Sequence, residues 1–338
     1  MLKSLYNSGI YPFIYLTFSY DKNKNAQDWL KNHYNIYWVP TVYWDGGAIV
    51  RIGGTSQYGA DITTCMSRPV ADLDAELHVG WLGNGKLRIT LSVKNNETVD
   101  YDGYVRVYVA EKLSSLGWKD AGGNTYTMPF LDFAVNEAVQ IPAGGVYEKD
   151  LIWDGNQHND GYGNNFGGIT YDNVMVTAAV FNGRGHTMYS NPPSGAPFTA
   201  YDADEVAFTE PAFLSADADT VPEAGGTVNF HLCGYGDHAG RNYLLLGSVS
   251  GTDPGTPLPG GQAVLPLNWD TFTNVVLSLL NSSIFSGFMG TLDGTGYAAA
   301  SLNLPPVPGM AGITLYFAYA LNGPWNFASN PVSVEIVP

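Results

Sequence analysis

Cysteine and histidine are the residues most often used for metal binding and redox chemistry, and both are sparse in this chain. The two cysteines, Cys65 and Cys233, are far apart in the sequence, and the six histidines are scattered over its length. Only His231, Cys233 and His238 lie near one another, and His231 and Cys233 share a face if one strand carries both. Two zinc ligands would fit this pattern, but we favour a buried cysteine inside a β-sandwich. Whether Cys65 and Cys233 pair is left open by the sequence.

No spacing of nucleophiles or carboxylates selects a catalytic site. The segment Gly247-Ser-Val-Ser-Gly251 has the wrong spacing for the Gly-x-Ser-x-Gly turn that exposes a nucleophilic serine. Glycoside hydrolysis needs two carboxylates placed across a cleft, and among 31 acidic residues no pair is singled out. We therefore expect no catalytic residues, no cofactor-binding residues and a protein that is not an enzyme.

Calcium is the one metal that the sequence suggests, because two regions are rich in hard oxygen ligands. The first is the loop of residues 154–165, which lacks the ordered spacing and closing glutamate of an EF-hand. The second is the expected junction between two β-sandwiches, where solvated linker acids are the interpretation that we favour. The candidate ligands are Asp154, Asn156 and Asp160 in the first region and Asp202, Asp204, Asp217 and Asp219 in the second.

Several tryptophans raise the question of sugar binding, because aromatic rings of binding modules stack on sugars. Core or interface tryptophan is the commoner use and the interpretation that we favour. The residues concerned are Trp81, Trp118, Trp153, Trp269 and Trp325.

The composition is typical of a β-rich extracellular protein. The chain has 338 residues, a formal net charge of −16 and only 14% charged residues, with 40 glycines, 20 prolines and 22 tyrosines. Its negative charge has the wrong sign for binding nucleic acid or anionic membranes. No window of about 18 apolar residues predicts a membrane span. We therefore expect a protein that is extracellular or on the cell surface, with no nucleic-acid partner.

The first 66 residues predict a small α/β segment. Residues 11–20 are aromatic and β-branched and predict a strand, and residues 26–34 predict a helix. Residues 36–44 and 48–52, joined by the turn Asp45-Gly-Gly47, predict a two-stranded hairpin.

This order of elements, with Val39-Pro40-Thr41 before the hairpin and Gly53-Gly54 after it, resembles the C-terminal half of a thioredoxin-like domain. The resemblance implies that Pro40 follows a cis peptide bond. It also implies that residues 2–10 are the end of the helix that carries Cys-x-x-Cys, a motif that would precede Met1. In that family a further strand lies in the sheet between the strand that matches residues 11–20 and the strand that matches residues 41–44. Without this further strand the sheet would have a gap with open edges.

Residues 67–209 and 210–338 predict two antiparallel β-sandwiches. Apolar and polar residues alternate in residues 87–93, 104–109 and 174–181, with glycine, asparagine and aspartate between such runs. The pattern of the first block resembles the immunoglobulin-like modules that follow thioredoxin-like domains in secreted bacterial surface proteins.

The last block also predicts one short helix, at residues 270–280, where an aspartate cap precedes apolar residues at helical spacing. The expected fold is therefore mostly β. An incomplete thioredoxin-like segment (1–66) precedes an immunoglobulin-like sandwich (67–209) and a C-terminal sandwich with one helix (210–338).

Three functions fit these features. We favour a non-catalytic extracellular structural or adhesive protein that self-associates into an oligomer or filament, in which a neighbouring chain completes the N-terminal sheet. The first alternative is a fragment of an exported thioredoxin-like oxidoreductase that lacks its Cys-x-x-Cys half. The second is a surface protein that binds glycans through sandwich loops or tryptophans.

Overall fold

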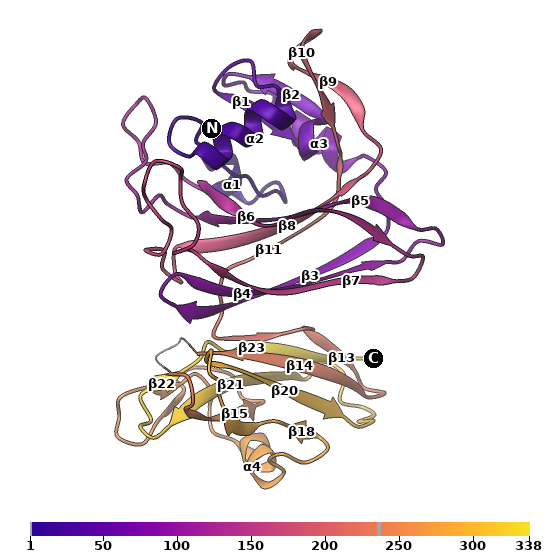
Figure 1. The fold of residues 1–338 in the computed structure, drawn as a ribbon. Coiled ribbons are helices and arrows are strands. Elements are labelled where there is room, and N and C mark those ends of the chain that lie inside the picture. The colour runs from indigo at the N-terminus through magenta and orange to yellow at the C-terminus, as the bar shows by residue number, and fades with distance from the viewer. Residues whose placement is uncertain (1, 235–237) are drawn as a thin grey trace. The chain divides into compact units, whose positions relative to one another are not determined.

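A computed structural model describes residues 2–234 and 238–338, and its fold is mostly β (Figure 1). The chain divides into two compact units. Unit 1 comprises residues 1–77 and 89–210, and unit 2 comprises residues 78–88 and 211–338. The expected boundary after residue 209 therefore lies next to the end of unit 1, whereas the expected boundary after residue 66 falls inside unit 1.

Unit 1 contains one four-stranded sheet and most of a three-stranded sheet, of which residues 78–88 are counted in unit 2. Within unit 1 the two sheets lie face to face in Figure 1. Their inner faces follow the period of two seen in the sequence, because Leu87, Ile89, Leu91 and Val93 are buried at alternate positions of one strand. The first sheet has the order β11-β8-β5-β6, with β5 (Tyr101–Glu111), β6 (Phe130–Ile141), β8 (Val174–Asn182) and β11 (Ala203–Thr209). The second has the order β3-β4-β7, with β3 (Leu73–Gly83), β4 (Lys86–Asn95) and β7 (Val146–Asp154).

The N-terminal residues cover the outer face of the first sheet (Figure 1). Helix α2 (Lys24–Tyr34) begins at Asn23, whose side chain accepts a hydrogen bond from Asn25 N at 2.9 Å. The Asn23 amide also donates to the carbonyls of Phe130 and Leu131 at 2.9 and 2.7 Å. These bonds fix the helix to β6, so residues 1–66 pack with the sandwich in one unit.

The buried guanidinium of Arg106 links helix α2 to the first sheet. Arg106 of β5 is 5% exposed, and its guanidinium lies 4.9 Å from the Trp29 ring of α2 and 4.4 Å from the Phe181 ring of β8. Cation–π contact offsets part of the cost of burying this charge. Every residue of β8 from Val174 to Phe181 is buried, since both faces of that strand are covered.

The strand expected at residues 11–20 is absent. These residues form one isolated bridge, in which Thr17 N donates to Met128 O at 2.7 Å and Phe130 N donates to Thr17 O at 3.0 Å. A strand needs a neighbouring strand to pair with, and here the segment meets only the start of β6. The short helix α1 (Leu2–Ser8) precedes it, and helix α3 (Tyr58–Met66) follows the hairpin described next.

Two short hairpins complete unit 1. The expected N-terminal hairpin consists of β1 (Thr41–Trp44) and β2 (Ile49–Ile52), joined by a 3₁₀ turn at Asp45–Gly47. The second consists of β9 (His186–Asn191) and β10 (Gly195–Ala200). The Val39–Pro40 peptide bond, immediately before β1, is cis.

Unit 2 has a core of its own, which two β-sheets and a short helix enclose. Helix α4 (Thr271–Ser278) starts at the Asp270 cap, close to its expected position. The first sheet has the order β12-β14-β20-β18, with β12 (Leu214–Ala216), β14 (Gly226–Cys233), β18 (Phe285–Ser286) and β20 (Tyr297–Leu304). The second has the order β13-β23-β21-β15-β19, with β13 (Thr220–Pro222), β15 (Asn242–Ser248), β19 (Met289–Thr291), β21 (Thr314–Asn322) and β23 (Val332–Val337). The short strands β16 (Thr256–Pro257) and β17 (Val264–Leu265) pair with each other, and β22 (Phe327–Ala328) pairs with β21.

No helix in residues 2–234 and 238–338 combines the length and the apolar character that a membrane-spanning helix needs.

Candidate functional site

Both thiols are buried and unpaired. Burial, more than any nearby charge, raises the pKa of Cys65 to about 12, and burial likewise raises the pKa of Cys233 to about 12. Thiol chemistry needs the thiolate, so both side chains are poor nucleophiles at neutral pH. In the part of the chain that the structure describes, no group of three or more His, Cys, Asp or Glu is placed to hold a metal ion. His231 is instead in hydrogen-bond contact with the Tyr297 hydroxyl, with 2.7 Å between Nδ1 and the oxygen.

The candidate calcium ligands of the 154–165 loop organise the loop itself. Asp160 is 1% exposed, and its Oδ1 accepts hydrogen bonds from Tyr162 N at 2.7 Å and Asn164 N at 3.1 Å. Asp154 Oδ1 accepts from Asn156 N at 3.0 Å. The carboxylates therefore act here as hydrogen-bond acceptors for successive turns.

The acidic residues of the second region also have protein partners. In unit 1, Asp202 lies 3.4 Å from Arg68 Nη1, and Asp204 accepts from the Tyr101 hydroxyl at 3.1 Å. In unit 2, Asp217 accepts from Asn229 N at 2.7 Å. The carbonyl oxygen of Asp219 accepts from Glu335 N at 2.8 Å.

Most of the tryptophans considered for sugar stacking are buried. Trp81, Trp118 and Trp153 are between 2% and 8% exposed, and Trp325 is half-buried. Trp269 is 51% exposed, and its Nε1 donates to Asn274 Oδ1 at 3.1 Å. Of the five tryptophans, Trp269 is therefore the one whose ring is largely exposed to solvent.

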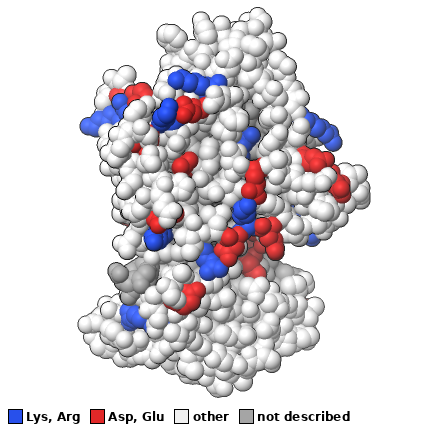
Figure 2. Space-filling model, in the orientation of Figure 1, with Lys and Arg blue, Asp and Glu red and all other residues white. Residues whose placement is uncertain are grey.

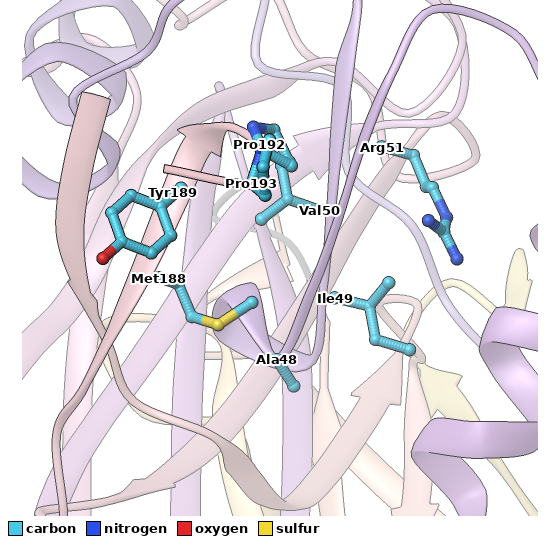
Figure 3. A pocket seen from close by; sticks show the side chains of 8 residues that line it. All are labelled: Ala48, Ile49, Val50, Arg51, Met188, Tyr189, Pro192 and Pro193. Carbon is cyan, nitrogen blue, oxygen red and sulfur yellow. The ribbon is translucent and has the colours of Figure 1, made fainter. Parts of the chain in front are cut away.

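A hollow of about 320 Å³ lies between β2 and β9 in unit 1 (Figure 3). Figure 3 shows Ile49 and Arg51 on one side of β2 and Val50 on the other. Successive side chains of a strand point to opposite faces of the sheet. Because side chains from both faces of β2 line the hollow, the hollow lies along the edge of this strand. Its lining consists of Ala48, Ile49, Val50 and Arg51 from β2 and the residue before it, and Met188, Tyr189, Pro192 and Pro193 from β9 and the turn that follows.

The backbone of β2 has an unpaired edge on the side away from β1. Gly53 N donates to Pro40 O at 2.8 Å, and the register pairs Thr41 with Ile52. Hydrogen-bonded and non-bonded pairs alternate in an antiparallel ladder, so Val50 and Ile52 direct their N–H and C=O groups away from β1. Among residues 2–234 and 238–338, β1 and β2 pair only with each other.

The β9–β10 hairpin supports β1 and β2 from one face. Buried Val50 packs with Phe198, and the rings of Tyr34 and Tyr43 stack at 4.2 Å. The Tyr43 hydroxyl lies 2.8 Å from Ser190 Oγ of β9. Burial raises the pKa of Tyr43 to about 12, so this contact involves a neutral phenol at physiological pH. The hollow thus has a packed, uncharged floor.

Arg51 is the one charged residue of the lining, and its charge is balanced. Its Nε donates to Asp61 Oδ2 at 2.9 Å and its Nη2 donates to Asp61 Oδ1 at 2.6 Å. Asp61 is 3% exposed, and a two-pronged pair of this kind holds the arginine in one orientation. Figure 2 shows that uncharged residues form most of the face in view.

Close to this hairpin, unit 1 exposes a short apolar segment that the sequence analysis did not single out. Tyr37, Trp38 and Val39 are 56%, 61% and 54% exposed. They follow α2 and precede β1, and no charged residue occurs between Tyr34 and Trp44. The lack of charged residues in this stretch is the sequence feature that could have drawn attention to the exposed segment. It does not distinguish exposed Trp38 from buried Trp44.

Comparison with known proteins does not assign the chain to a family. No family model and no curated sequence matches it. The structure of red sea bream transglutaminase shares 12% identity at a TM-score of 0.22, over 84% of this chain and 34% of that protein. A β-glucosidase from Bifidobacterium adolescentis shares 17% identity at a TM-score of 0.22, over 42% of this chain and 17% of that enzyme. These TM-scores are too low to assign a fold or an activity.

Proposed function

We propose that this chain is a non-catalytic extracellular structural or adhesive protein that self-associates, with a neighbouring chain completing its N-terminal sheet. The observation that carries the proposal is the isolated β1–β2 sheet, whose outer edges pair with no strand among residues 2–234 and 238–338. A two-stranded sheet is marginal alone, and free edges are sites where another chain adds a strand.

The proposed origin of this sheet is half of a thioredoxin-like domain attached to immunoglobulin-like sandwiches. The order α2, cis Pro40, β1, β2 and α3 supports that origin for the N-terminal residues. The buried, weakly acidic thiols of Cys65 and Cys233 offer no support for a redox activity of the described chain.

Sedimentation velocity of the purified chain over a hundredfold range of concentration tests the proposal. The expected result is a sedimentation coefficient that rises with concentration. A single species of 36.4 kDa at every concentration would overturn it.

A further inference from the structure

We infer that the indole ring of Trp269 in unit 2 is a stacking platform for a neutral glycan. The inference goes beyond the proposed self-association, which concerns the N-terminal sheet of unit 1, and the two stand or fall separately. It is carried by an exposed tryptophan in a fixed orientation, by an amide group beside the ring, and by a surrounding chain with almost no charge.

The ring of Trp269 is exposed but held in place. It lies immediately before the Asp270 cap of α4 and is 51% exposed. Its Nε1 donates to Asn274 Oδ1 at 3.1 Å, which limits rotation of the ring. The Asp270 carboxylate accepts from Thr273 N at 2.9 Å and from Val249 N at 2.8 Å, which fixes the backbone next to the ring. A platform that is already oriented reduces the entropy cost of binding a ligand.

Asn274 gives this platform a polar edge. Its Oδ1 accepts the bond from Trp269, so its NH2 group is the other arm of the same amide. Asn274 is exposed, and within the part of the chain that the structure describes its NH2 group donates to no protein atom. A sugar ring presents C–H groups on its faces and hydroxyl groups around its rim. An aromatic ring with an amide at its edge can bind both.

The exposed face of α4 continues this mixture of apolar and uncharged polar groups. Val275 and Leu279 are 40% and 37% exposed, and Thr271 is exposed as well. These three residues are four apart and therefore lie on one face of the helix. An apolar partner would bury the Thr271 hydroxyl and the Asn274 amide without hydrogen bonds, which is costly. The hydroxyl groups of a glycan would bond to both.

Charge favours a neutral glycan over a charged polymer. In residues 254–334 the charged residues are Asp270 and Asp293 and no others. Asp270 caps α4, and Asp293 Oδ1 accepts from Thr295 N at 2.8 Å and from Tyr297 N at 3.0 Å. On the face of unit 2 in view, Figure 2 shows mainly uncharged residues. This stretch therefore has no cation to pair with the phosphates of nucleic acid or the carboxylates of an acidic polysaccharide.

Electrophoresis in native gels that contain a polysaccharide tests the binding. The neutral probes are hydroxyethylcellulose, dextran, galactomannan and xyloglucan, and the acidic probe is alginate. We expect at least one neutral polysaccharide to retard the unchanged chain and alginate to leave its mobility unaltered. Retardation by alginate alone would overturn the inference. Retardation by no polysaccharide would also overturn it and would favour a protein partner for this face.

Three substitutions that leave the charge of the chain unaltered locate the site. Trp269→Ala is expected to weaken the affinity for the retarding polysaccharide by about tenfold or more, and Trp269→Phe, which keeps a smaller ring, by less. The matched control is Trp38→Ala, because Trp38 is 61% exposed but belongs to unit 1. It is expected to be retarded as the unchanged chain is. Full retardation of Trp269→Ala would show that the site is wrong.

Hydroxyl-radical footprinting of the unchanged chain gives a readout that does not depend on how the variants fold. The polysaccharide that retards the chain is expected to lower oxidation of Trp269 severalfold and to leave oxidation of Trp38 unaltered. Oxidation of Trp269 that is the same with and without bound polysaccharide would place the binding elsewhere and overturn the inference.

Discussion

At the scale of single residues, the turn between β1 and β2 shows how closely this hairpin fits the sandwich. Gly46 has a φ of 73°, and a Cβ atom at that position would lie 2.1 Å from the carbonyl oxygen of Tyr201. Only glycine combines this backbone conformation with such a close approach. The sequence predicted the turn, but the approach to Tyr201 depends on a residue far along the chain.

Gly46→Ala is therefore expected to destabilise unit 1 by about 2 kcal/mol or more, because it adds backbone strain and a clash with main-chain atoms. Urea unfolding followed by tryptophan fluorescence measures the change. Gly54→Ala is the control, since nothing lies within 4 Å of a Cβ atom at Gly54. Equal stability of the two variants would show that the turn is not packed in this way.

The two thiols provide a second residue-scale prediction. Cys65 and Cys233 are buried and their pKa values are raised to about 12, so thiolate is scarce at pH 7.5. Native protein is expected to react with a thiol reagent at least about a hundredfold more slowly than denatured protein, since reagent access then requires opening of the fold. Rapid labelling of either cysteine in the native state would contradict the buried placement.

At the scale of elements, helix α4 is the clearest match between pattern and structure. Asp270 caps the helix by accepting from Thr273 N at 2.9 Å, and the same carboxylate accepts from Ser248 Oγ and Ser250 N, each at 2.9 Å. The sequence showed the cap and the helical spacing, whereas the serines come from a strand and loop that only folding brings near. Burial opposes ionisation of Asp270, but these hydrogen bonds outweigh burial and hold its pKa far below the usual range.

Asp270→Ala is expected to lower the stability of unit 2 by about 1–2 kcal/mol at pH 7 through loss of the helix cap. A carboxyl whose pKa is depressed by folding contributes stability that is present above pH 4 and is lost as the pH falls through about 4 and below. The difference between Asp270→Ala and the unchanged chain should therefore shrink in acid. Asp270→Asn can keep the bond from Thr273 N through its Oδ1, but its NH2 group cannot accept from Val249 N and Ser250 N as Oδ2 does, so it should also lose stability at pH 7. A difference that stays constant from pH 7 to pH 3 would contradict the role of the ionised carboxylate.

Other elements differ in how well the sequence pattern predicted them. The mostly β fold, the antiparallel sheets, the first hairpin and helix α2 were all predictable from periodicity and turn residues. The strand expected at residues 11–20 was wrong, because strand formation depends on a partner that the local sequence does not contain. Helix α3 was not predicted, since its β-branched residues favour other states and its stability comes from packing of Tyr58, Ile62 and Cys65 near Trp44.

The candidate site was not predictable for the same reason. Its walls come from residues 48–51 and 188–193, which only the folded sheet and hairpin bring together. The exposure of Trp38 likewise depends on which neighbours cover an aromatic run, and its sequence surroundings resemble those of buried Trp44.

At the scale of the whole molecule, charge decides how copies can meet. The chain carries −16 but only 14% charged residues, so repulsion acts over long range while large areas of surface are neutral. The proposed self-association works against this repulsion, so it must use the neutral areas of the surface.

Added salt is therefore expected to strengthen association, because it screens the repulsion between copies without weakening an apolar contact. Raising NaCl from about 0.02 M to about 0.3 M shortens the screening length severalfold, so the fraction of associated chain in sedimentation velocity should rise. Dissociation by salt would instead indicate a contact built from charged pairs.

Hydrogen–deuterium exchange of β2 at low and high protein concentration tests the central claim most directly, because it asks whether a second chain covers the open edge of this sheet. If so, the outward amide of Ile52, a residue that is 37% exposed, exchanges more slowly in concentrated than in dilute protein. Exchange of the 48–53 segment that is independent of concentration, in a chain that stays at 36.4 kDa, would contradict the account.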